Sequence, residues 1–145
     1  SLNSRMDTLQ ATFLLSILAD FPDYLTQRRA QARRYLEGLR EQVEFPQVTD
    51  SAEPSYNFFV ILAKDRDILQ EYLIKRGIET KIHYPIPIHR LDSSKDKQYR
   101  TFGLKGSSLE DAERYTANIL SLPLGPHLSD QQIDYTIDQI RVFYG

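Results

Sequence analysis

Apolar residues recur at intervals of three and four along the start of the chain, which predicts a long helical segment over residues 1–40. In its first half the stripe consists of Met6, Leu9, Phe13, Leu14, Ile17, Leu18 and Phe21. Ser4, with Asp7 three residues later, has the spacing of a capping box at the start of this helix. Pro22 has no backbone N–H and its ring clashes with the preceding turn. We therefore expect a break or kink near Phe21, and hence a long helical hairpin.

The second half of this segment carries an apolar stripe and a strongly basic face. The stripe ends near Gly38 and consists of Leu25, Ala32, Tyr35, Leu36 and Leu39. The other face carries Arg28, Arg29, Arg33, Arg34 and Arg40. The ordinary interpretation of such a run is a solvated helix face. The alternative is a surface that binds an anionic ligand or partner.

The rest of the chain mixes strand-like and helix-like patterns, which predicts an α+β fold. Aromatic and β-branched runs predict strands at 56–63 and 78–82, with a short extended piece at 121–124. Helical spacing predicts helices at 65–76, at 108–120 and from 129 onward. Gly77 is placed to cap the first of these, and Ser129 with Gln132 forms a capping box for the last. Residues 41–145 should therefore form a small three-stranded antiparallel sheet packed with helices.

Composition excludes several classes of function. The 145 residues contain no cysteine, so disulfides, thiolate zinc sites and cysteine nucleophiles are absent. The net charge of −2 gives no reason to expect nucleic acid as a partner. No apolar run has the length of a membrane span, and the N-terminus lacks the layout of a signal peptide. We expect a soluble, cytoplasmic protein with no membrane partner.

The most distinctive stretch runs from Gly77 to His89, where an apolar strand leads into two prolines with a histidine on either side. Prolines fix their own φ and bias the preceding residue towards an extended conformation. The segment should therefore be a rigid arm that holds His83, Tyr84 and His89 in set directions, as binding loops often do. The ordinary interpretation is a proline-rich connection with surface histidines. A metal site built from His83, His89 and His127 is disfavoured, because no carboxylate has suitable spacing.

Taken together, these motifs resemble the C-terminal, small domain of DegT-type nucleotide-sugar aminotransferases, which are pyridoxal-phosphate enzymes of the aspartate-aminotransferase fold. The resemblance runs from Asn3 to the last helix. Its motifs are 3–7 with 10–11, 28–29 with Ala32 and Tyr35, 77–80, 83–89, 112–114, and 119–124 with Pro126. One departure is Asn57, where relatives often carry a histidine.

The resemblance implies that residues 1–40 form an interdomain and dimer helix, and that 41–145 form the small domain. In this family the lysine that forms a Schiff base with the cofactor, and the acid that pairs with the pyridine nitrogen, lie in a large N-terminal domain. That domain is not in this sequence. We therefore assign no catalytic residue here, and none of Lys64, Lys75, Lys81, Lys95, Lys97 and Lys105 takes the Schiff-base role. This chain alone should bind little or no cofactor and lack activity.

The resemblance also implies two sets of binding residues. Asn3 and Arg5 would reach the cofactor phosphate of the neighbouring subunit, a role suited to an amide, a guanidinium and a helix N-terminus. The alternative is that Asn3 and Ser4 merely cap the helix and Arg5 is solvated. His83, Tyr84 and His89 would bind the substrate, because their side chains can hydrogen-bond sugar hydroxyls and phosphate oxygens. The lysine-rich loop at 92–107 either covers a diphosphate or is disordered.

Two functions follow. In the first, the chain completes a homodimeric enzyme that moves an amino group from glutamate to a keto-sugar nucleotide, with pyridoxal phosphate as cofactor. In the second, it is a binding or dimerisation module without catalysis. In either case, the apolar stripe of the first helix should be exposed in this chain, since it would normally pack against another domain.

Overall fold

A computed structural model describes residues 5–90 and 109–145. In order, their elements are α1 (Thr8–Leu39), β1 (Phe59–Leu62), α2 (Arg66–Ile74), the 3-10 helix η1 (Ile88–Arg90), α3 (Glu110–Asn118), β2 (Ile119–Leu122) and α4 (Asp130–Tyr144). The predicted α+β class is confirmed. The predicted loop at 92–107 lies outside the described residues. No helix in the described ranges is both long enough and apolar enough to cross a membrane.

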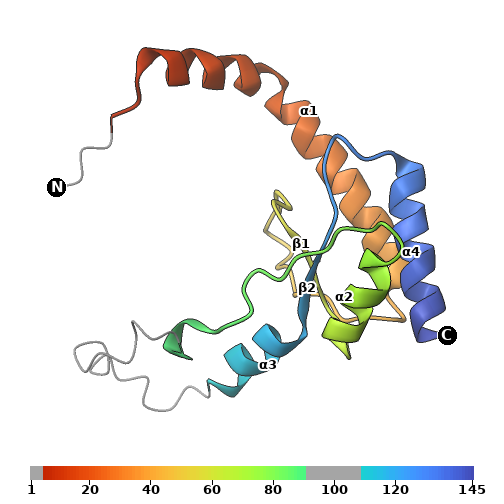
Figure 1. Cartoon of the computed structure of the whole chain (residues 1–145). Helices are drawn as coiled ribbons and strands as arrows, with labels where there is room; N and C mark the ends of the chain where they lie inside the picture. The colour runs from red at the N-terminus through yellow and green to blue at the C-terminus, as the bar shows by residue number, and fades with distance from the viewer. Residues whose placement is uncertain (1–4, 91–108) are drawn as a thin grey trace.

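Helix α1 is one continuous helix with Pro22 inside it, so the expected hairpin is wrong. The proline bends the helix without ending it, and Figure 1 shows the change of direction between its red and orange parts. The start also differs from the prediction. Asp7, not Ser4, is the N-cap: its carboxylate accepts from the Gln10 N–H at 2.8 Å, and the Gln10 side chain returns a bond to the Asp7 N–H.

The sheet has two strands where three were predicted. β1 and β2 pair antiparallel, with Phe59 opposite Leu122 and Leu62 opposite Ile119. The predicted strand at 78–82 is reduced to one bridge, in which Lys81 and Ser121 exchange backbone hydrogen bonds. On the other edge of this segment, the carbonyl of Thr80 accepts from the Gln70 side chain of α2 at 3.2 Å. Hydrogen-bonded pairs alternate along an antiparallel ladder, so the next one would join Glu79 to Pro123. Pro123 has no backbone N–H, and its carbonyl accepts from the Tyr35 hydroxyl, so the ladder does not extend.

The core lies between the sheet, the second half of α1 and α4. From α1 come Ala32, Tyr35 and Leu39, and from α4 come Ile133, Ile137 and Ile140. The two helices approach closely at Gly38, where an added Cβ would lie 2.8 Å from Ile137 Cγ2. Figure 1 shows the blue α4 beside the orange part of α1. Arg34 of α1 adds ion pairs to Asp130 and Asp134 of α4.

The helix ends around the sheet follow local signals, with one exception. Gly77 caps α2 as predicted: its φ is +78°, and the Ile78 N–H donates to the Leu73 carbonyl at 3.0 Å. The predicted Ser129–Gln132 capping box of α4 is present. The helix predicted at 108–120 ends earlier, because Ile119 and Leu120 belong to β2. Leu120 is fully buried in that strand, so tertiary burial decides its conformation.

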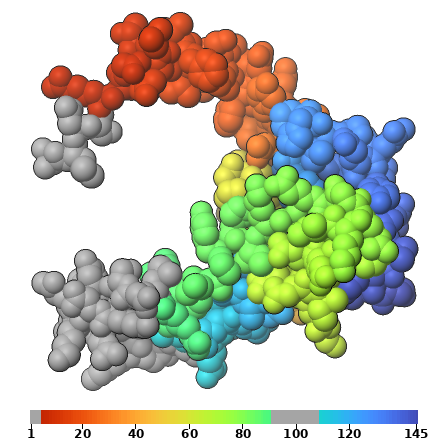
Figure 2. All heavy atoms as spheres, in the orientation of Figure 1, coloured from red at the N-terminus to blue at the C-terminus, as the bar shows by residue number. Residues whose placement is uncertain are grey.

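The first half of α1 contacts little of the rest of the molecule. Figure 2 shows its red part projecting away from the body formed by the other elements. The exposed side chains include Met6, Leu9, Phe13, Leu14, Leu15, Ile17, Leu18 and Phe21. The prediction of an exposed apolar surface on the first helix is therefore confirmed.

Candidate functional site

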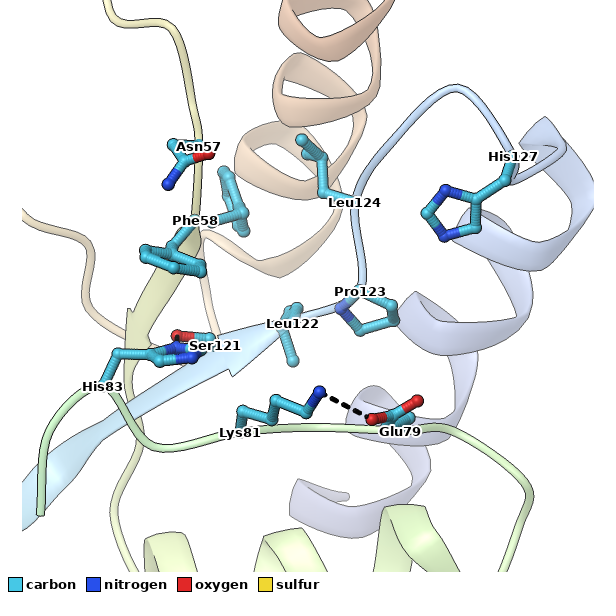
Figure 3. A pocket seen from close by; sticks show the side chains of 11 residues that line it. Asn57, Phe58, Glu79, Lys81, His83, Ser121, Leu122, Pro123, Leu124 and His127 are labelled. Atoms are coloured by element: carbon cyan, nitrogen blue, oxygen red, sulfur yellow. Dashed lines mark hydrogen bonds and ion pairs between the residues drawn. The ribbon is translucent and has the colours of Figure 1, made fainter. Parts of the chain in front are cut away.

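A cleft of about 290 Å³ opens beside the sheet, where the end of β2 faces the extended arm (Figure 3). Small-molecule sites combine an apolar lining with a few polar groups, and this cleft does so. Its apolar lining comes from Phe58, Phe59, Leu122, Pro123 and Leu124, and its polar lining from Asn57, Glu79, Lys81, His83, Ser121 and His127.

His83 is the predicted binding residue that the structure places in the cleft. Its Nδ1 lies 2.9 Å from the Ser121 hydroxyl, and its ring stacks on Phe58 with centroids 4.0 Å apart. These contacts fix the ring, and no described residue bonds to its Nε2. The Tyr84 ring meets His83 edge-on at 5.7 Å but is 70% exposed and does not line the cleft. The peptide bond between these two residues is cis.

His89 lies apart from the cleft, so the arm does not bring the three predicted residues together. It belongs to η1, and its Nε2 is 3.1 Å from Glu113 Oε1 of α3. Arg90 binds the same carboxylate at 2.7 Å. The hydrogen bonds from His89 and Arg90 lower the pKa of the Glu113 carboxyl below its ordinary value. This cluster ties the end of the arm to α3.

His127 lines the cleft on the side away from His83, and sequence reasoning missed it as a binding residue (Figure 3). The sequence singled it out only for the disfavoured metal site. Across the two described ranges, no group of three His, Cys, Asp or Glu side chains is placed to hold a metal ion. The one sequence signal was that His127 follows the Gly125–Pro126 turn, which comes just after the predicted extended piece at 121–124.

Two arginines of the predicted basic face bind the protein itself rather than solvent. Arg28 Nη1 donates to the carbonyls of Tyr56 and Asn57 at 2.9 and 3.3 Å. Arg29 donates to the carbonyl of Pro54 and pairs with the Glu53 carboxylate. Together they hold the loop before β1, in which Tyr56 adopts a φ of +47°. Neither a solvated face nor an anion site describes these two side chains; they position the Asn57 wall of the cleft.

Of the two predicted cofactor residues, the structure describes Arg5, which precedes the end of α1 remote from the cleft. Asn3 is outside the described residues, and Arg5 is exposed beyond the free end of α1 (Figure 1). At 1.5 Å per residue, the helix between Thr8 and the first buried position, Gln31, is roughly 35 Å long. Arg5 and His83 therefore do not form one site within a single copy of the chain.

The described lysines do not fit a Schiff-base role. A Schiff-base lysine needs an amine that is desolvated and free to lose its proton. Lys81, which lines the cleft, pairs with Glu79 at 2.9 Å, and Lys75 pairs with Glu71 at 2.7 Å, both on exposed surface. Lys64 is exposed as well. None of these three lysines therefore has the environment that a Schiff-base lysine needs.

Relatives of known sequence match almost the whole chain. The dTDP-3-amino-3,4,6-trideoxy-alpha-D-glucose transaminase of Streptomyces venezuelae is 35% identical over 141 residues, which are 96% of this chain and 36% of that protein. The erythromycin biosynthesis sensory transduction protein EryC1 of Saccharopolyspora erythraea is 33% identical, over 96% of this chain and 37% of its own length. The chain thus spans little more than a third of these relatives.

Solved structures agree with the sequence matches. A DegT DnrJ EryC1 StrS aminotransferase from Brucella abortus superposes with a TM-score of 0.89 and 34% identity, covering 100% of this chain and 38% of that one. DesV of S. venezuelae, solved in complex with a ketimine intermediate, gives a TM-score of 0.86 and 34% identity, over 98% and 38%. The profile of the DegT/DnrJ/EryC1/StrS aminotransferase family matches residues 1–141. The chain therefore belongs to the DegT/DnrJ/EryC1/StrS aminotransferase family.

Proposed function

We propose that this chain is the C-terminal part of an aminotransferase that moves an amino group from glutamate to a keto-sugar nucleotide. The observation that carries the proposal is the 35% identity, over 96% of the chain, to the dTDP-3-amino-3,4,6-trideoxy-alpha-D-glucose transaminase of S. venezuelae. Other similar proteins support the substrate class, including a dTDP-3-amino-3,6-dideoxy-alpha-D-galactopyranose transaminase from Aneurinibacillus thermoaerophilus at 31% identity. The reaction would take place in the cytoplasm.

In this proposal the cleft forms the sugar-facing wall of the active site. Leu122, Pro123 and Leu124 offer an apolar surface to the face of a sugar ring. His83, oriented by Ser121 and Phe58, directs a ring nitrogen to a substrate oxygen. Tyr84 borders the site from the exposed side. His89 remains a predicted substrate contact, although its bond to Glu113 places it outside the cleft.

The cofactor in this proposal is pyridoxal 5'-phosphate, bound mainly by residues outside this sequence. When bound, it supplies the electron sink that amino-group transfer needs. Asn3 and Arg5 would contribute donors to the phosphate of the neighbouring subunit in a homodimer. The position of Arg5 at the far end of α1 supports a contact between subunits, because the helix carries it away from its own cleft.

A second candidate is a binding or dimerisation module without catalysis. The exposed apolar stripe on the first half of α1 favours it, since such a surface is typical of a protein interface. The exposure of Lys64, Lys75 and Lys81 also favours a non-catalytic module, as long as only these residues are considered. The two candidates differ in turnover, and one assay separates them.

The assay measures amino transfer from glutamate to a keto-sugar nucleotide by the natural protein that carries these residues. We expect turnover, and a visible absorbance band from lysine-bound pyridoxal phosphate. We expect neither from the 145 residues alone. His83→Ala should lower kcat/KM about tenfold or more through a lost substrate contact, whereas His89→Ala should lower it less. A natural protein with neither the band nor turnover would leave the binding module as the function.

A further inference from the structure

Gln31 breaks the apolar pattern of α1 at a position that is almost fully buried. Its neighbours Ala32 and Tyr35 are core residues, and Gln31 itself is only 2% exposed. A buried amide is unfavourable unless its polar atoms have partners. Gln31 Nε2 donates to the carbonyls of Gly125 and Leu128, each at 3.0 Å, and its Oε1 accepts from the Gly125 N–H at 3.0 Å.

All of these partners belong to one turn. The Leu128 N–H also donates to the Gly125 carbonyl at 3.0 Å, which closes the turn over residues 125–128. The amide of Gln31 thus binds both ends of a turn that lies more than ninety positions away in the sequence. Tyr35, one helical turn further, donates its hydroxyl to the Pro123 carbonyl at 2.9 Å. This face of α1 therefore holds the backbone between Pro123, which lines the cleft, and the start of α4.

The turn controls where the His127 ring lies. Gly125 has a φ of +154°, and a Cβ added there would be 2.8 Å from His127 Cε1 and 3.0 Å from its Nδ1. The imidazole is therefore seated directly on the glycine, with no room for a side chain between them. Gln31 fixes the backbone on one side of this contact, and Gly125 shapes the seat of the ring on the other.

The seated ring has unused hydrogen-bonding capacity. Within residues 5–90 and 109–145, no side chain or backbone group forms a hydrogen bond with the His127 imidazole, although it lines the cleft. His83 lies on the other side of the same cleft, with Leu122 and Pro123 between them (Figure 3). A turn held this firmly places an exposed polar ring, without a described hydrogen-bond partner, at the cleft, which is the arrangement of a binding group.

We propose that His127 is a substrate-contacting residue and that Gln31 is the residue that positions it. The imidazole would hydrogen-bond an oxygen atom of the nucleotide sugar, either on the sugar or on the diphosphate. This inference rests on the proposed function, because it takes the nucleotide sugar as the occupant of the cleft. It assigns Gln31 no contact with substrate.

The experiment uses the natural protein that carries these residues, in steady-state kinetics with glutamate and a keto-sugar nucleotide. His127→Ala should raise KM for the nucleotide sugar about tenfold, with kcat and the KM for glutamate nearly unchanged. Gln31→Met keeps the length and the apolar contacts but loses all three hydrogen bonds. It should raise the same KM about three- to tenfold.

The double variant separates positioning from a general loss of stability. If Gln31 acts through His127, adding Gln31→Met to His127→Ala should raise KM no further. Gln139→Met is the matched control: Gln139 lies on α4, away from the cleft, and accepts a bond from Tyr72 of α2, so its loss should leave KM unchanged. Should Gln31→Met fail to fold, Gln31→Leu replaces it.

Inhibition by the nucleoside diphosphate alone shows which part of the nucleotide sugar His127 contacts. If His127→Ala weakens this inhibition, the contact is with the diphosphate. If the inhibition is unchanged, the contact is with the sugar.

Two results would overturn the inference while the proposed function stands. One is an unchanged KM in His127→Ala, and the other is an additive effect of the two substitutions. Calorimetric measurement of nucleotide-sugar binding tests the opposite case, in which the inference stands and the proposed function fails. A natural protein that binds it without turnover, and binds it less tightly as His127→Ala, would retain the inference and lose the proposed function. A protein that neither binds nor turns over the nucleotide sugar loses both.

Discussion

The two halves of α1 carry the same kind of apolar stripe but have opposite environments. In the first half Leu9 is 85% exposed, whereas in the second half Leu39 is fully buried. Both leucines lie on one continuous helix. The second half has α4 and the sheet to pack against, and the first half has no described element beside it (Figure 1). Helical periodicity therefore predicts which face will pack, and leaves open what it packs against.

The bend at Pro22 lies close to the boundary between the two halves. Beyond it, Arg28 is the first side chain of α1 to hydrogen-bond the loop before β1. Before it, the exposed stripe is larger and more continuous than scattered surface leucines would be. The first half thus has the composition of an interface, and its contribution to the stability of this chain alone should be small.

A matched pair of leucine substitutions tests this contrast with the largest expected effect. Leu39→Ala should lower the free energy of unfolding by about 3 kcal/mol, because it opens a cavity in the core. Leu9→Ala should change it by less than about 0.5 kcal/mol, since the side chain is already in water. Urea denaturation of the 145-residue chain measures both. Equal losses in the two variants would show that the first half folds back onto the domain in solution.

A pair of arginine substitutions locates the start of the packed half with a smaller effect. Arg28→Met keeps the apolar stem but loses the bonds to the carbonyls of Tyr56 and Asn57, which should cost about 1–2 kcal/mol of unfolding free energy. Arg33→Met should cost less than about 0.5 kcal/mol, because Arg33 is exposed and has no bond to any described residue. The same denaturation experiment compares them. Indistinguishable variants would mean that Arg28 is solvated, as the sequence alone suggested.

The parts of the fold that sequence predicted correctly are those set by neighbouring residues. The capping box of Ser129 and Gln132 and the glycine cap at Gly77 depend on short spacings, and both are present. The third strand failed partly for a non-local reason: at the next pairing position, Pro123 has no N–H, and Tyr35 of α1 takes its carbonyl. Leu120 was placed in a helix because a short apolar run suits both helix and strand, and only burial decides between them.

The candidate site divides in the same way. The rigid arm pointed to His83, Tyr84 and His89 alike, and it took the structure to show that His83 lines the cleft and the other two do not. His127 and Asn57 reach the same cleft from segments far apart in the sequence, and no local pattern joins them. Gln31 was hidden for a further reason. A polar residue on a helix suggests exposure, and only the tertiary structure reveals backbone groups from the 125–128 turn around its amide.

The end of the arm, at His89 and Arg90, is peripheral like the first half of α1, but polar contacts hold it to α3. The effect expected from breaking these contacts is the smallest of the three. Its anchor is Glu113, whose pKa is lowered by hydrogen bonds from His89 and Arg90. A carboxyl with a folded pKa below its ordinary value of 4.5 binds fewer protons in the folded than in the unfolded chain at acidic pH. Its stabilising effect is therefore complete above that value and is lost as pH falls through the lower folded pKa.

Glu113→Gln should be slightly less stable than the parent chain at pH 6, and the difference should shrink below about pH 4 in urea denaturation at stepped pH. A difference that persisted unchanged at pH 3 would mean that the arm is held without the carboxylate charge.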